Sequence, residues 1–96
     1  MISTNNMARV LKVSGDVKRV EPANGTDFSL EELKEFVDGY IEIIQLPNNE
    51  IMVINENGKV VDLPFNELAT NIYQELIYKG DYIAGDALIC DKEQVK

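Results

Sequence analysis

The hydrophobic pattern of this chain changes its period at Gly39, and this change restricts the folds that are open to it. Before Gly39, the apolar side chains of residues 30–38 fall on one stripe of a helix. After it, residues 40–46 are dense in β-branched side chains, and residues 51–54 form a continuous apolar run typical of a strand buried on both faces. A chain of 96 residues has room for one modest core. We therefore expect a single small α+β domain.

The beginning of the first helix is specified locally. Ser29 and Glu32 have the spacing of a capping box, in which each side chain accepts a backbone hydrogen bond from the other residue. Phe28 can pack against Leu33 as a hydrophobic staple across this cap. These two signals predict an amphipathic helix over residues 30–38.

The other segments predict a mixed, mostly antiparallel sheet of five or six strands and a second helix. Asn57-Gly58 is typical of a hairpin turn and leads into a short strand that completes a three-stranded meander. Asn66 can cap the second helix, which Gly80 closes, and Gly85 marks a bulge or a close backbone approach in the last strand. The predicted strands are residues 8–13, 17–20, 40–46, 51–54, 59–62 and 82–90.

The organisation that follows is a flexible lead over residues 1–7, one α+β domain over residues 8–90 and a polar tail over residues 91–96. The first residues lack the basic start and apolar core of a signal peptide, and no apolar run approaches the roughly 18 residues of a membrane span. We therefore expect a cytoplasmic protein that does not bind membranes.

Charge and missing residue types exclude several classes of function. Seventeen acidic residues against nine basic ones give a net charge of -8, which repels nucleic-acid phosphates, so we do not expect direct nucleic-acid binding. The chain has no histidine, and its only cysteine, Cys90, lies in an apolar run typical of a buried, inert thiol. The six glycines stand singly, so no glycine-rich loop can hold a phosphate. We expect no enzyme activity, no cofactor and no metal site.

One candidate surface is acidic. Glu31, Glu35 and Asp38 share one face of the predicted helix, and Glu42 follows shortly after it. Such a face can be merely solvated, can bind a partner, or, less readily, can bind a metal ion. We take these four residues as the candidate partner-binding residues.

A second candidate surface is basic and lies in the hairpin that we expect residues 8–13 and 17–20 to form. It can be a charged sheet edge that resists strand addition, a site for a small anionic ligand, or a contact with a partner. Most acidic residues follow this hairpin in the sequence, so we expect charge of opposite sign at two ends of the molecule. The basic residues are Arg9, Lys12, Lys18 and Arg19.

Several segments carry a family resemblance in their order and spacing, over about residues 8–90. They are residues 9–13, the Leu-Glu-Glu-Leu of 30–33, and residues 39–46, 55–59, 63–66 and 83–89. In these segments the chain resembles a family of small domain-of-unknown-function proteins of phages, plasmids and Gram-positive bacteria. The resemblance implies a compact α+β module of mobile elements with no assigned reaction.

A phage-type origin suggests a non-catalytic anti-defence role in the host cytoplasm. The first hypothesis is an inhibitor that docks its acidic face onto a basic nucleic-acid-handling host protein, such as a CRISPR effector. The second is an oligomer, a sponge, that sequesters an anionic nucleotide immune signal with the basic hairpin. The third is a regulatory or assembly factor. We favour the inhibitor slightly because acidic charge dominates the chain.

Overall fold

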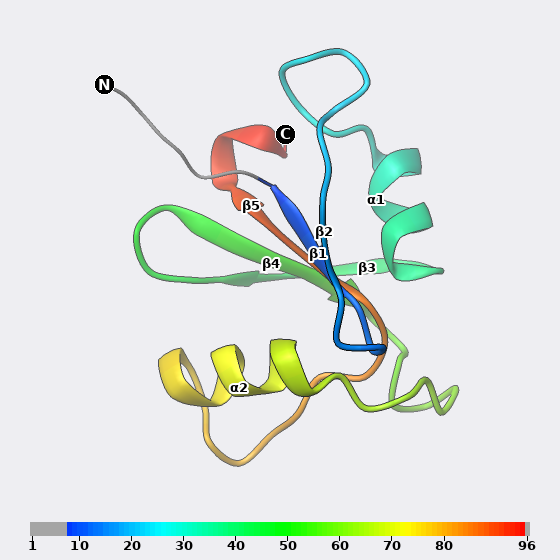
Figure 1. The fold of residues 1–96 in the computed structure, drawn as a ribbon, viewed down its shortest axis with the longest axis vertical. Helices are drawn as coiled ribbons and strands as arrows, with labels where there is room; N and C mark the ends of the chain where they lie inside the picture. The colour runs from blue at the N-terminus through cyan, green and yellow to red at the C-terminus, as the bar shows by residue number, and fades with distance from the viewer. Residues whose placement is uncertain (1–7, 96) are drawn as a thin grey trace.

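The computed structural model describes residues 8–95 of the chain. Five strands form one antiparallel sheet in the order β2-β1-β5-β4-β3 (Figure 1). This arrangement, with two helices, confirms the predicted α+β domain. The strands are β1 (Arg9–Leu11), β2 (Val17–Arg19), β3 (Ile41–Gln45), β4 (Glu50–Asn55) and β5 (Ala87–Asp91); the helices are α1 (Leu30–Val37), α2 (Glu67–Leu76) and the 3₁₀ helix η1 (Lys92–Gln94).

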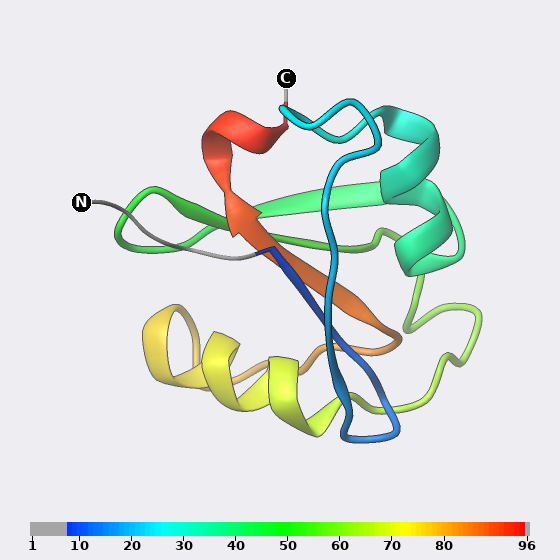
Figure 2. The same cartoon turned by 45° about the horizontal axis from the view of Figure 1, so that its top comes forward.

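The sheet separates two hydrophobic clusters, with α1 on one face and α2 on the other (Figure 2). Leu33 of α1 packs in the same cluster as Ile51 of β4, whereas Ala69 of α2 packs with Met52. Because successive side chains of a strand point to opposite faces, β4 supplies both clusters, and it needs apolar residues at consecutive positions. The continuous apolar run of this strand is thereby explained.

The cap predicted for α1 is present. Ser29 Oγ accepts a hydrogen bond from the Glu32 N–H at 3.1 Å, and Glu32 Oε1 accepts one from the Ser29 N–H at 2.8 Å. The other carboxylate oxygen of Glu32 accepts from the Ala23 N–H, which ties the preceding loop to the helix. The N–H of Ser29, and then that of Ala23, hold the pKa of Glu32 below its ordinary value because they stabilise the ionised form.

The hairpin predicted at Asn57-Gly58 is wrong. Residues 56–62 form consecutive turns with no strand, and neither Asn57 nor Gly58 has the positive φ that the predicted turn type requires. Gly58 serves a tertiary contact instead, because a Cβ at this position would lie 2.7 Å from the carbonyl oxygen of Ala84. The turn with two positive φ values joins β3 to β4 and uses Asn48 and Asn49, at 64° and 62°.

The predicted ends of α2 and of the last strand also need correction. α2 begins after Asn66 as predicted but ends at Leu76 rather than near Gly80. The last strand begins at Ala87 rather than at residue 82. Ahead of it, the Ile83 N–H donates to the Thr70 hydroxyl of α2 at 2.8 Å, so a helix side chain takes the place of a strand partner.

Gly85 and the C-terminal segment lie close to other parts of the fold. Gly85 has φ of 89°, and its N–H donates to the Pro64 carbonyl at 2.7 Å, so the predicted close backbone approach is present, although it lies before the last strand and not within it. The segment predicted as a polar tail includes the end of β5 and η1, and Val95 forms an isolated bridge with Phe28. The predicted flexible lead, residues 1–7, lies outside the described residues.

Candidate functional site

The acidic face predicted on α1 is present for three of its four residues. Glu31, Glu35 and Asp38 are exposed, and the helical spacing of the first two holds their carboxylates on the side away from the buried Leu33. None of the three acidic residues forms an ion pair with another residue of the described chain. The capped helix therefore presents a row of carboxylates to solvent.

Glu42 does not belong to this face. It lies two positions before Ile44, which packs in the α2-side cluster, and successive side chains in β3 alternate between the two faces. The carboxyl group of Glu42 therefore lies on the α2 side, where it lines a hollow with Tyr73 of α2. The predicted four-residue surface is divided by the sheet.

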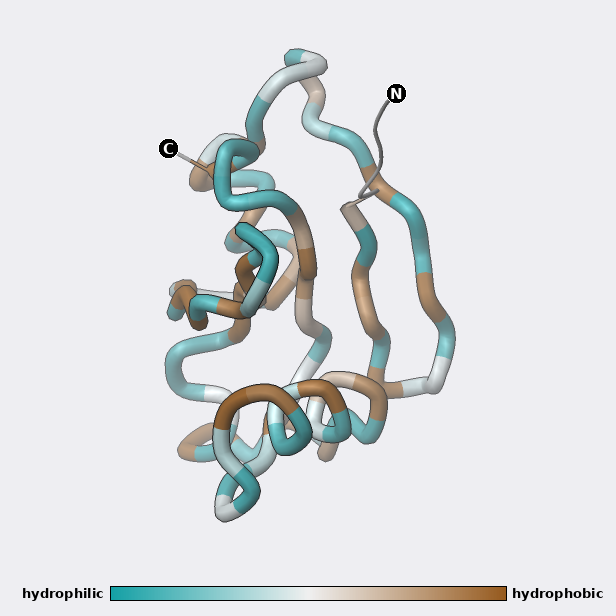
Figure 3. Tube along the Cα trace, turned by 90° about the vertical axis from the view of Figure 1, so that its left-hand side faces the viewer, coloured by the Kyte–Doolittle hydropathy of each residue, from teal (hydrophilic) through white to brown (hydrophobic). Residues whose placement is uncertain are grey.

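The basic side chains of the first hairpin also lie on both faces of the sheet, because successive side chains of a strand alternate between faces. Hydrophilic and hydrophobic stretches follow one another along both strands of the hairpin that β1 and β2 form (Figure 3). Val10 packs in the α1-side cluster and Lys18 is its partner across the ladder, so Lys18 lies on the α1 side. Arg9 and Arg19 are partners one position along and therefore lie on the α2 side.

Two of the basic residues are neutralised within the fold. Arg9 forms an ion pair with Glu50 at 3.5 Å, and the Lys12 ammonium lies 3.6 Å from Asp86. Lys12 and Lys18 line a hollow of about 140 Å³ that Glu35 and Asp86 also line. Acidic and basic residues thus meet on the α1 side, so the expected separation of charge does not hold at this part of the surface.

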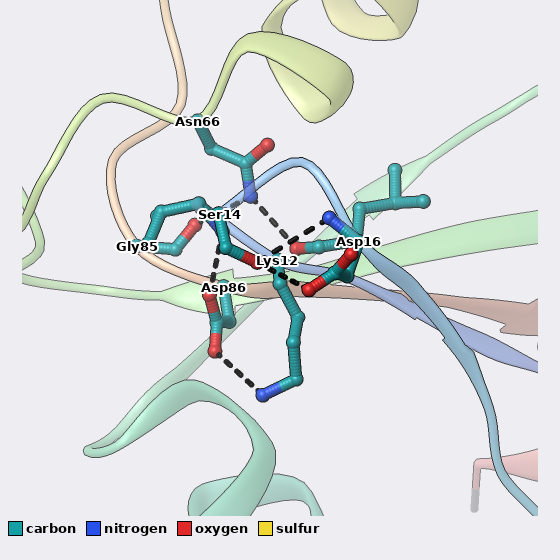
Figure 4. Close-up of polar contacts among 8 residues, drawn as sticks. Lys12, Ser14, Asp16, Asn66, Gly85 and Asp86 are labelled. Atoms are coloured by element: carbon teal, nitrogen blue, oxygen red, sulfur yellow. Dashed lines mark hydrogen bonds and ion pairs between the residues drawn. The ribbon is translucent and has the colours of Figure 1, made fainter.

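A buried amide supports the junction beside Lys12 (Figure 4). Asn66, which is fully buried, donates from Nδ2 to the carbonyl oxygens of Leu11 and Gly85, each at 2.8 Å. Its Oδ1 accepts from the Ala69 N–H at 3.0 Å and so caps α2. One side chain thereby links the first hairpin, the start of α2 and the segment before β5.

Asp86 joins the segment before β5 to the first hairpin, nearer the surface than Asn66. Its Oδ1 accepts from the Val13 N–H at 2.9 Å, and its Oδ2 faces the Lys12 ammonium (Figure 4). Ser14 and Asp16 close the hairpin turn by hydrogen bonds to each other. The polar groups of this region are therefore engaged in holding the fold rather than free for a ligand.

A hollow of about 200 Å³ on the α2 side was not predicted. Lys59 forms an ion pair with Asp81 there, and its ammonium lies 4.7 Å from the centroid of the Tyr82 ring. The hydrogen bond from Lys59 lowers the pKa of Asp81, and the same bond raises the pKa of Lys59. No local sequence pattern joins Lys59 to Asp81, because the pair depends on the chain reversal between the turns at 56–62 and the end of α2.

Two carboxylates border this hollow without an ion pair in the described chain. They belong to Glu42 and Glu56, and the lining also includes Tyr73 and the apolar Ile54. Because Lys59 already neutralises Asp81, the hollow carries a net negative charge. Its chemistry suits an ammonium or guanidinium group of a partner.

Comparison with known protein families assigns the chain to one of them. A family model described as a domain of unknown function, DUF3846, matches residues 7–95. The chain belongs to the DUF3846 family. Searches among curated proteins and among solved structures found no match to this chain. The match confirms the predicted resemblance of this DUF3846 chain to a family of small domains of unknown function.

The described residues of this DUF3846 domain contain no group of three metal-ligating side chains that could hold a metal ion. Among them, no helix is long and apolar enough to cross a membrane. Cys90 is fully buried, as predicted for an inert thiol, and burial raises its pKa to about 12. The exposed carboxylates of α1 and the acidic hollow on the α2 side are the two concentrations of negative charge described above on this DUF3846 domain.

Proposed function

We propose that this DUF3846 protein is a non-catalytic binding protein that docks the outer face of α1 onto a basic partner. The observation that supports the proposal is the exposure of Glu31, Glu35 and Asp38 on one capped helix, without an ion pair in the described chain. Fixed carboxylates of one sign attract a basic surface at long range and orient it on approach.

The proposal in its finer form is an anti-defence inhibitor of phage or plasmid origin that acts in the host cytoplasm. Its target is a basic nucleic-acid-handling host protein such as a CRISPR effector, where carboxylates occupy positions meant for phosphates. The net charge of -8 and the exposed carboxylates of α1 support this form. The nucleotide sponge has less support, because Arg9 and Lys12 are already paired and lie on opposite faces of the sheet.

The test is a matched pair of double variants that remove the same amount of charge. Glu31→Gln with Glu35→Gln changes α1, and Glu67→Gln with Glu75→Gln changes exposed positions of α2 on the other side of the sheet. Each protein is immobilised, host lysate is passed over it, and retained proteins are identified and then measured for affinity. We expect the α1 variant to weaken partner binding about tenfold, which corresponds to about 1.4 kcal/mol, and the α2 variant to retain it.

One result would contradict the proposal as a whole, and a second would contradict its finer form. Equal loss of binding in both double variants would show that net charge alone attracts the partner. Retention of a partner that double-stranded DNA fails to displace would show that the partner does not use a nucleic-acid channel to bind this protein.

A further inference from the structure

β3 forms one edge of the sheet and has a strand beside it on one side only within residues 8–95. The Glu56 N–H donates to the Tyr40 carbonyl at 2.8 Å, and the Leu46 N–H donates to the Glu50 carbonyl at 2.9 Å. These two bonds lie at even-numbered positions of the β3 segment, and an antiparallel ladder alternates bonded with non-bonded pairs. Odd-numbered residues therefore turn their backbone groups away from β4. The outward groups are the N–H and C=O of Ile41, Ile43 and Gln45.

The two edges of the sheet differ in their protection. β2 has only three residues, all exposed, and includes Lys18 and Arg19, which is a pattern that resists strand addition. β3 has five residues, and Glu42 is its only charged side chain. Ile43 is 41% exposed, and Tyr40 just before the strand is 68% exposed. An edge with a single charged side chain and exposed apolar residues is a site for pairing with another strand.

We propose that β3 pairs antiparallel with β3 of a second copy of this chain, about a two-fold axis at Ile43. In this register Ile43 faces Ile43 of the partner subunit, and Ile41 faces Gln45 of the partner subunit. Every outward N–H of one strand then meets an outward C=O of the other, so the two sheets become one continuous sheet.

The distribution of charge along β3 favours a second copy in this register. Glu42 lies opposite Ile44 of the partner subunit, so no like charges face each other across the junction. A register shifted by two residues places Glu42 opposite Glu42 of the partner subunit, which is destabilising. A shift of two residues the other way leaves Ile41 opposite Pro47 of the partner subunit, which has no N–H to donate, so this register makes fewer hydrogen bonds. The register centred on Ile43 is therefore the one in which the strand is best matched to itself.

The surface beside β3 is hollowed on the α1 side. A hollow of about 310 Å³ lies next to Ile43 and Gln45, with the apolar Val95 in its lining. The paired strand brings Ile41 and Ile43 of the partner subunit towards this hollow. Its border carries one base and one acid, Lys92 and Glu93, so the local charge is balanced although the whole chain is acidic. Burial of these apolar side chains drives the association.

The first experiment measures the mass of the full chain by sedimentation equilibrium over a concentration series. We expect dimers that dissociate on dilution. Ile43→Pro removes an N–H that points outwards, so it spares the ladder with β4 but should weaken the dimer about tenfold or more. Ile43→Val keeps the N–H and the branched side chain, and it should remain dimeric. A wild-type chain that is monomeric at every concentration, or a Pro variant as dimeric as the Val variant, would overturn the proposal.

A second experiment does not depend on tolerance of proline. Ile43→Lys places two ammonium groups opposite each other at the axis and should also give monomers. In the wild type, amide hydrogen exchange of Ile41, Ile43 and Gln45 should slow as the protein concentration rises, whereas Glu42 and Ile44 should be protected at every concentration. Exchange of the odd-numbered amides that is independent of concentration would refute the pairing. This inference uses β3 and not α1, so its failure leaves the proposed function untouched.

Discussion

At the scale of single residues, Asn66 forms more hydrogen bonds to distant segments than the local sequence predicts. Its role as the N-cap of α2 was predictable, because a cap depends on residues three positions away. Its two bonds to Leu11 and Gly85 were not, because they join segments 55 and 19 residues away in the sequence. The bond that the amide oxygen accepts is therefore predictable from the sequence, whereas the two bonds that its nitrogen donates depend on the fold.

Asn66→Ala should destabilise the domain by about 3 kcal/mol, because it removes a helix cap and leaves two buried carbonyl groups without their donor. Urea denaturation of the variant measures this loss. Asn71→Ala, at an exposed position of the same helix, serves as the control and should change the free energy of unfolding by less than about 0.5 kcal/mol. Equal stabilities for the two variants would show that the carbonyl groups find other partners.

The buried thiol of Cys90 should make the stability of the domain depend on pH at alkaline values. Burial, followed by the nearby charges of Asp91 and Glu50, raises the pKa of its thiol from 9.0 to about 12. The unfolded chain therefore releases this proton first, so the stability that the neutral thiol contributes is complete below about pH 9 and is lost as pH rises towards about 12. The stability difference between the wild type and Cys90→Ala should shift by about 1.4 kcal/mol per pH unit in this range. A difference that stays constant between about pH 8 and about pH 11 would contradict this.

At the scale of elements, local signals located the beginnings of both helices better than their ends. Ser29 with Glu32 specified the beginning of α1, because the capping bonds close within one turn. Asn57-Gly58 misled for the opposite reason. The dipeptide is compatible with a hairpin, but the contact between Gly58 and Ala84 selects a different conformation, and that contact depends on a distant segment.

Gly58→Ala tests this explanation of the turns at 56–62. A Cβ placed 2.7 Å from the Ala84 carbonyl oxygen forces two backbone segments apart, and the variant should lose about 1–3 kcal/mol of stability. Val60→Ala, in the same turns but 84% exposed, should be within about 0.5 kcal/mol of the wild type. Thermal unfolding of both variants makes the comparison. An unchanged Gly58→Ala variant would show that the turns are not held against Ala84.

At the scale of the whole molecule, the three-layer arrangement decides which charges act together. The carboxylates of α1 were predictable as one surface because helical spacing is a local property. Glu42 was wrongly grouped with them because only the sheet determines which face of β3 looks towards α1. The division of Arg9 and Lys12 between two faces has the same cause.

The two proposed contacts of this molecule should respond to salt in opposite directions. Raising the ionic strength from about 0.01 M to about 1 M shortens the Debye length from about 30 Å to about 3 Å. Binding of a basic partner to the α1 face should weaken, because screening removes the attraction between opposite charges. Pairing of β3 with a second copy should strengthen, because screening removes the repulsion between two chains that each carry a net charge of -8. Sedimentation equilibrium and partner affinity measured over one salt series separate the contacts, and a dimer that dissociates as salt rises would show that ion pairs rather than β3 hold the copies together.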